Sequence, residues 1–126
     1  KAKLDTIGGI VTISKSLTLK TAWIDTGIQG TNLGTGSYIV QISGMTSAAT
    51  NTYNEIFTGF MSWYAEGTNS TDSNEVILHA AGHATNGRHL YLRTVRQANG
   101  ILKLQVAFSA DLTTATNVTF KFRKLI

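Results

Sequence analysis

Apolar and polar residues alternate with a period of two along most of this 126-residue chain. The segment VTFKF, for example, places Val118, Phe120 and Phe122 on one face and Thr119 and Lys121 on the other. Strict alternation that is rich in β-branched and aromatic residues is typical of a strand with one buried face. The pattern therefore predicts strands, and no segment shows a convincing helical period.

Turn-rich segments such as GIQGTNLGTG, EGTNSTDSN and GHATNG separate these runs. The pair Asn99-Gly100 lies between two well-patterned runs, which is a strong indication of a hairpin. Many short strands in a chain of this length predict an all-β fold, an antiparallel β-sandwich or a barrel. The expected strands cover residues 7–14, 17–24, 37–44, 54–65, 74–80, 89–96, 101–109 and 117–125.

One expected strand, EIFTGFMSWY, is apolar on both faces. Its faces consist of Ile56, Phe60 and Tyr64 on one side and of Phe57, Met61 and Trp63 on the other. A strand in a sandwich needs only one apolar face for the core, and monomers seldom expose a contiguous row of large apolar side chains. We therefore expect Ile56, Phe60 and Tyr64 to contact a second subunit. A long loop folded over this face is the alternative.

Charge is sparse and unevenly distributed. Charged residues make up 14% of the chain, against about 25% in soluble domains. Residues 1–75 hold four lysines and six acids, whereas residues 76–126 hold seven basic residues and one acid. Such an imbalance can attract an anionic surface or let copies of the chain complement one another, and a solvated face without consequence is the alternative.

Several further features concern the context of the chain. It has no cysteine, so no disulfide contributes to its stability. No apolar run approaches the roughly 18 residues that a transmembrane helix needs, and no signal peptide is evident. Because the chain begins at Lys1, we expect it to be the C-terminal piece of a longer protein.

The segment LHAAGHATNGRHLYLRT contains all three histidines of the chain. His79 and His83 lie four residues apart, which would align two metal ligands on a helix. Here, however, His79 ends an expected strand, a glycine-containing loop follows, and His89 begins the next strand. We therefore expect no metal site within the chain and assign the histidines to polar packing in a loop or interface.

The sequence also lacks the usual motifs of catalysis. It contains no G-x-S-x-G nucleophile elbow and no glycine-rich phosphate-binding motif, and none of its seven acids stands out as half of a glycosidase pair. We therefore expect no enzymatic activity and no cofactor.

Arginines near one tyrosine form the remaining candidate site. Arg88, Arg93 and Arg96 lie close to Tyr91 in the sequence and could grip carboxylate or phosphate groups. Arg93 and Tyr91 share a strand face, while Leu90 and Leu92 point to the core. A structural role for at least one of these arginines is the competing interpretation. A nucleic-acid domain would show aromatic residues on an open basic face, and we expect no nucleic-acid partner.

Several segments together resemble the C-terminal knob domains of tail needles and tail fibres of tailed bacteriophages. The resemblance covers about Lys20 to Ile126, and no single motif carries it. The segments are LKTAWIDTGIQGTNLGTGSYIVQI, FTGFMSWY, LHAAGHATNGRHLYLRT, LKLQVAF and FKFRKLI. In that reading residues 1–19 are the end of a shaft and the first strand, and residues 20–126 are the knob domain.

The resemblance implies a homotrimer of antiparallel sandwiches with a jelly-roll, tumour-necrosis-factor-like build. It further implies an extracellular place at the tip of the virion tail, joined to the rest of the needle or fibre through its N-terminal end. Such a knob would contact a bacterial outer-membrane or surface component, or help to penetrate the envelope, without an enzymatic step. The resemblance does not distinguish a needle from a fibre.

No site of that family transfers to a particular position, so the candidate ligand- or receptor-binding residues come from this chain alone. They are Trp63, His83, Arg88, Tyr91 and Arg93, with the loop SAATNTYN at a tip. Grooves between subunits are the natural place for a ligand, because a smooth sandwich offers little concavity. The alternative function is a carbohydrate-binding module or lectin that reads sugars with Trp23, Trp63 or Tyr64, and a small nucleic-acid-binding barrel is a third class.

Overall fold

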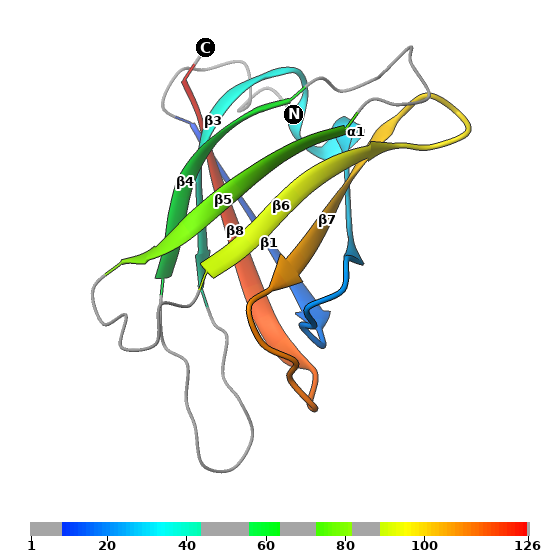
Figure 1. Cartoon of the computed structure of the whole chain (residues 1–126). Helices are drawn as coiled ribbons and strands as arrows, with labels where there is room; N and C mark the ends of the chain where they lie inside the picture. The colour runs from blue at the N-terminus through cyan, green and yellow to red at the C-terminus, as the bar shows by residue number, and fades with distance from the viewer. Residues whose placement is uncertain (1–8, 44–55, 64–72, 82–88, 126) are drawn as a thin grey trace.

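The computed structural model describes residues 9–43, 56–63, 73–81 and 89–125. Side chains are described throughout these ranges except for Trp63 and for the β5 residues other than Ile77. The elements follow in the order β1 (Ile10–Leu17), β2 (Ile24–Gln29), α1 (Gly30–Leu33), β3 (Gly36–Ser43), β4 (Ile56–Trp63), β5 (Ser73–Ala81), β6 (His89–Arg96), β7 (Leu102–Phe108) and β8 (Thr116–Lys124) (Figure 1). The expected all-β, antiparallel architecture is confirmed.

The strands pair in one continuous series, in the order β1-β8-β3-β4-β5-β6-β7-β2. β3 and β4 pair over seven residue pairs, whereas β4 and β5 pair over only three, Ile56–Thr58 with His79–Ala81. Two antiparallel layers result, β1-β8-β3-β4 and β5-β6-β7-β2, and Figure 1 shows β5 and β6 crossing in front of β8 and β1. The fold is therefore a β-sandwich.

The core lies between the two layers and follows the alternation in the sequence. In β8, Val118, Phe120 and Phe122 are buried, and the residues between them are more exposed. Contact between the layers is direct, because the rings of Phe57 in β4 and Phe108 in β7 pack edge to face with centroids 5.9 Å apart. The remaining buried core residues are Leu19, Ile28, Leu33, Tyr38, Val40, Ile42, Met61, Leu90, Leu92, Leu104, Val106 and Leu112.

Tyr38 is a polar exception within this core, and α1 accommodates it. Its hydroxyl lies 2.9 Å from the carbonyl oxygen of Leu33 and 2.6 Å from that of Gly34, so its proton has an acceptor. Burial raises the pKa of Tyr38, because the charged phenolate would be poorly solvated there. The short helix thus satisfies a buried hydroxyl that would otherwise destabilise the fold.

The strand predicted over residues 17–24 is wrong for most of its length. Residues 18–23 connect the layers, and β2 follows at Ile24, with its second half in the segment GIQGTNLGTG where the sequence indicated turns. The connection lies against the β7–β8 connection, where the Lys20 and Leu19 carbonyls accept hydrogen bonds from the amides of Phe108 and Leu112. Leu19 is fully buried, so this apolar residue of the alternating pattern belongs to a connection that packs on the core.

The helix α1 was not predicted and occupies part of the segment read as a turn. Strands β3 to β7 lie side by side in chain order, so the pairing does not confirm the expected jelly-roll connectivity. β1 pairs along its whole length with β8, which makes it an integral part of the sandwich.

Candidate functional site

The outer side of the β1-β8-β3-β4 layer carries a row of apolar residues around one arginine; we call this side the β8 face. The register aligns Ile10 with Arg123, Arg123 with Ile39, and Ile39 with Phe60, so these four residues cross the layer in one line. Ile10 is 54% exposed and Phe60 is 69% exposed. Ile39 and Phe60 lie side by side, and Arg123 separates them from Ile10, so the row is an apolar stripe interrupted by one cation.

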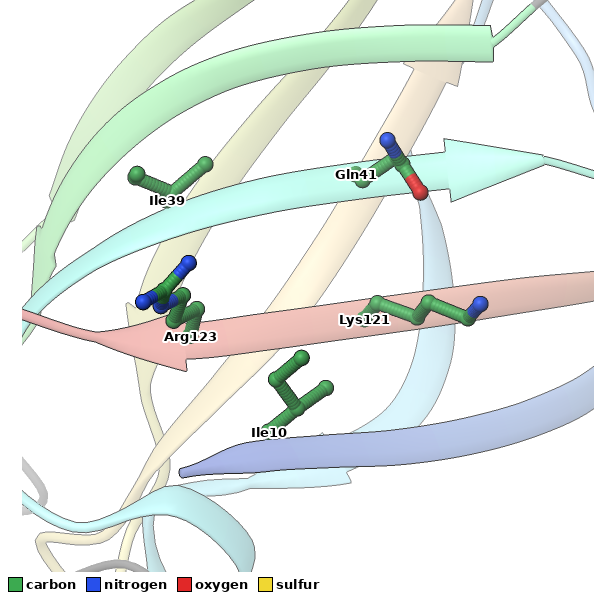
Figure 2. A pocket seen from close by; sticks show the side chains of 5 residues that line it. All are labelled: Ile10, Ile39, Gln41, Lys121 and Arg123. Carbon is green, nitrogen blue, oxygen red and sulfur yellow. The ribbon is translucent and has the colours of Figure 1, made fainter. Parts of the chain in front are cut away.

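A shallow hollow of about 200 Å³ lies on the β8 face next to this row. Ile10, Ile39, Gln41, Lys121 and Arg123 line it. Figure 2 shows that Ile10 on β1 and Ile39 on β3 lie on either side of β8, which contributes both cations. The hollow therefore combines two aliphatic walls, one amide and two positive charges.

The outward residues of the β8 face include cations but no acid. Lys121 and Arg123 are exposed, and neither makes an ion pair within the described part of the chain. Hydroxyl pairs such as Ser14–Thr119 and Ser37–Ser62, each with oxygens 3.2 Å apart, occupy neighbouring rows. The sixteen outward positions are residues 10, 12, 14, 16, 37, 39, 41, 43, 56, 58, 60, 62, 117, 119, 121 and 123.

The outer side of the other layer, which we call the β6 face, holds a cluster of aromatic and polar side chains. The guanidinium carbon of Arg93 lies 4.4 Å from the ring centroid of Trp23, a cation–π contact. Tyr91 meets Trp23 edge to face with centroids 6.3 Å apart, and His89 meets Tyr91 in the same way at 4.7 Å. On β6, alternation places His89, Tyr91 and Arg93 on the outer side and the buried Leu90 and Leu92 on the inner side.

A chain of hydrogen bonds extends from Arg93 across the β6 face. Nε of Arg93 donates to Oε1 of Gln105 at 2.8 Å, and Nε2 of Gln105 donates to Oδ1 of Asp25 at 2.7 Å. Nζ of Lys103 lies 3.2 Å from the other Asp25 oxygen. The Gln105 hydrogen bond, together with Lys103, lowers the pKa of Asp25. Asp25 and Lys103 therefore neutralise each other, and Arg93 supplies the net positive charge of these four linked side chains.

The structure brings together some of the expected site residues. Tyr91 and Arg93 share the β6 face with Trp23, and Ile56 and Phe60 are exposed on the β8 face, with Ile56 40% exposed. The expected subunit-contact residues of β4 are thus partly at the surface of the protomer, while their neighbours Phe57 and Met61 are buried in its core. Outside the described residues lie His83, Arg88, Tyr64, the side chain of Trp63 and the loop SAATNTYN.

Sequence reasoning missed the partners that neighbouring strands supply. Ile10, Ile39 and Arg123 come from three strands, and only the register brings them into one row. Gln105 and Asp25 likewise reach Arg93 through strand pairing. The alternation indicated which residues share a face of one strand, but contained no signal for the alignment between strands.

No group of three or more histidine, aspartate or glutamate residues in the described part of the chain could hold a metal ion. None of the helices found in residues 9–43, 56–63, 73–81 and 89–125 is long and apolar enough to cross a bilayer.

Comparison of the chain with protein-family models, with curated proteins and with solved structures found no match.

Proposed function

We propose that this chain is the non-enzymatic distal knob of a phage tail needle or tail fibre and that it works as a homotrimer. In this role it contacts, or helps to penetrate, the envelope of a Gram-negative cell. The sequence resemblance motivates the assignment, and the β-sandwich is compatible with it. A jelly-roll build of the sandwich is part of the same proposal.

The observation that carries the trimer is the exposed apolar row on the β8 face. Phe60 is 69% exposed although its strand already contributes the buried Phe57 and Met61 to the core. Ile10 and Ile39 continue the row across β1 and β3. A side chain as large as phenylalanine removes much apolar area from water when a neighbouring copy covers it, and this burial stabilises the assembly.

The size of the face is compatible with a subunit contact. Four strands spaced about 4.8 Å apart, each about eight residues long at about 3.3 Å per residue, cover roughly 500 Å². Contact over such a face would bury roughly 1,000 Å² in total, which is near the lower limit for specific interfaces. Each copy in a ring meets two neighbours, so a second contact adds to this area.

The charge of the face favours a ring over a two-fold dimer. A two-fold contact through the β8 face would place Lys121 and Arg123 against the same face of the partner, whose outward positions offer no acid, because isologous interfaces pair a surface with itself. A closed ring instead joins two different surfaces of neighbouring copies. The cations can then meet another part of the partner, and like-charge repulsion is avoided.

Sedimentation velocity of the 126-residue chain tests the assembly. We expect a particle of three 13.6-kDa chains at about 10 µM, and we expect Phe60→Asp to yield monomers. Thr113→Asp adds the same charge at an exposed position in the β7–β8 connection and should leave the trimer intact. A wild-type monomer at tenfold higher concentration, or a Phe60→Asp trimer, would contradict the proposed assembly.

Cosedimentation with Gram-negative outer-membrane fragments tests the tip role separately. We expect the wild-type trimer to pellet with these fragments and to remain in solution with protein-free vesicles of neutral phospholipid. A stable trimer that fails to pellet with outer-membrane fragments would keep the assembly and overturn the envelope-contacting function.

The second candidate function is a carbohydrate-binding sandwich, and the cluster on the β6 face favours it. Trp23 and Tyr91 lie together beside Arg93 at the surface of the second layer. A monomer that binds glycans through this cluster would support the second candidate over the knob.

A further inference from the structure

The guanidinium of Arg93 is fixed in place on the open β6 face. The Trp23 ring lies 4.4 Å beneath it, and the Gln105 side chain accepts its Nε hydrogen at 2.8 Å. Gln105 is itself oriented, because its amide nitrogen donates to Asp25 at 2.7 Å. An arginine held from two directions has already lost most of its conformational freedom, so a ligand that binds it incurs little further entropic cost.

This arrangement engages only one side of the guanidinium among the side chains that the structure describes. The two terminal amino groups of Arg93 make no hydrogen bond within the described part of the chain, and only Nε is engaged. These two amino groups present parallel N–H donors that match the two oxygens of a planar oxyanion. Arg93 is only partly exposed.

The charges of Arg93 and of the side chains linked to it through Gln105 favour an anion with a single negative charge. Asp25 and Lys103 lie 3.2 Å apart and neutralise each other. The linked group of Arg93, Gln105, Asp25 and Lys103 therefore has a net charge of +1, which comes from Arg93. A phosphate monoester with nearly two negative charges would lack a second cation and would lie near the Asp25 carboxylate. A carboxylate fits both the charge and the fork geometry.

The surroundings of Arg93 favour a sugar as the carrier of that carboxylate. Tyr91 lies on the same face of β6, and the register places Ile77 opposite it, 49% exposed. Together they offer an aromatic and aliphatic strip beside the cation, suited to the C–H surface of a pyranose ring. The strip lies along an open sheet face, which suits a polymer whose successive units add weak contacts.

We propose that the β6 face binds a carboxylate-bearing sugar of an acidic polysaccharide, with Arg93 gripping the carboxylate and Tyr91 contacting the ring. Gln105 acts as a positioning residue for Arg93. The site lies on the layer opposite the β8 face and does not depend on the assembly proposed above.

Glu75 is the acid that the register places opposite Arg93 on β5. An ion pair with Glu75 is the structural explanation that competes with ligand binding. The two explanations make opposite predictions for Glu75→Gln. Removing a negative charge next to a carboxylate site should strengthen binding, whereas loss of a structural ion pair should destabilise the fold without strengthening binding.

The test is a titration of the 126-residue chain with tetragalacturonate at low salt, followed by NMR through the Arg93 Nε–H and the indole N–H signals. We expect both the Arg93 and the Trp23 signals to shift. The fully methyl-esterified oligosaccharide has the same sugar rings without the charge and should bind at least about tenfold more weakly. Equal binding of the ester, or the absence of any shift, would overturn the proposal.

Variants test the role of each residue. Arg93→Lys keeps the charge but loses the planar fork, so we expect about tenfold weaker binding. Gln105→Leu should weaken binding by releasing Arg93, and Lys124→Gln, which removes one charge elsewhere, should change affinity less than about twofold. Thermal unfolding of each variant establishes that it is folded. Unchanged binding by Arg93→Lys, or tighter binding of polyphosphate or single-stranded DNA at the same signals, would contradict the carboxylate–sugar assignment.

Discussion

Asp111 shows how one side chain joins two connections at an end of the sandwich. Its Oδ1 accepts a hydrogen bond from the backbone amide of Thr21 at 2.7 Å and another from the Thr21 hydroxyl at 3.1 Å. The backbone bond, then the hydroxyl bond, lower the pKa of Asp111, and nearby Lys20 acts in the same direction. The ionised carboxylate is therefore the form that the folded state favours.

This linkage predicts a defined pH dependence. Because the pKa of Asp111 is lower in the folded chain than its ordinary value of 3.8, its contribution is present above pH 3.8 and is lost as the pH falls through the folded pKa. Asp111→Asn retains an acceptor but does not titrate. Urea denaturation should thus show a smaller loss of unfolding free energy between pH 7 and pH 3 for this variant than for the wild type. Identical pH profiles, or an NMR titration midpoint of Asp111 at or above 3.8, would contradict this assignment.

Strand β2 illustrates how an irregular element is stabilised by its partners. Its register with β7 shifts between Asp25 and Gln29, and Gly27 lies within the shift at φ +82°. Thr26 is buried, and its hydroxyl donates to the Leu104 carbonyl at 2.7 Å and accepts from the Ile28 amide at 3.1 Å. Thr26 faces the core because of the alternation of β2, and the two hydrogen bonds satisfy its hydroxyl there.

The positive φ of Gly27 predicts a cost for any substitution that adds a Cβ. Gly27→Ala should lower the unfolding free energy by about 1–2 kcal/mol, because residues other than glycine are strained in this region. The added Cβ would lie 3.2 Å from Lys15 Nζ, the flexible end of a side chain that can move, so backbone strain dominates. Asparagine tolerates this conformation better, and Gly27→Asn should be the less destabilising variant in urea denaturation. Equal stability of Gly27→Ala and the wild type would contradict this account.

The whole molecule presents two outer faces with different chemistry. The β8 face combines an apolar row with two cations that make no ion pair within the described residues, and the β6 face combines a fixed arginine with aromatic rings. If neighbouring copies cover the β8 face with a surface other than their β6 face, the β6 face on the opposite layer remains available for a ligand. Assembly and recognition are then assigned to separate layers of one sandwich (Figure 1).

A trimer whose dissociation accompanies unfolding has a melting temperature that depends on protein concentration. We expect Tm to rise by roughly 3–5 °C for each tenfold increase in wild-type concentration, given the entropy of unfolding of a domain of this size. Phe60→Asp should show a Tm that is independent of concentration. Differential scanning calorimetry over a hundredfold concentration range measures both, and a constant wild-type Tm would count against coupled assembly.

Much of the fold could be predicted from the period of the sequence. Residues 89–96 were expected as a strand and form β6 with the same bounds, and residues 37–44 correspond to β3 within one residue. The alternation also indicated which residues are buried, because side chains on a strand point to opposite faces. The strand predicted over residues 17–24 was wrong, because an alternating segment also suits a connection that packs on the core. The short helix α1 was missed because it has too few residues to show a period.

For the two surface clusters, too, the sequence predicted neighbours within one strand but not neighbours on different strands. That Tyr91 and Arg93 share a face, and that Ile56 and Phe60 share another, followed from a spacing of two or four residues within one strand. Placing Trp23 under Arg93, or Arg123 between two isoleucines, required strands distant in the chain to pair in a particular register. Local periodicity specifies only a face of one strand. The neighbours across it depend on hydrogen bonds and core packing between distant segments, which no local pattern encodes.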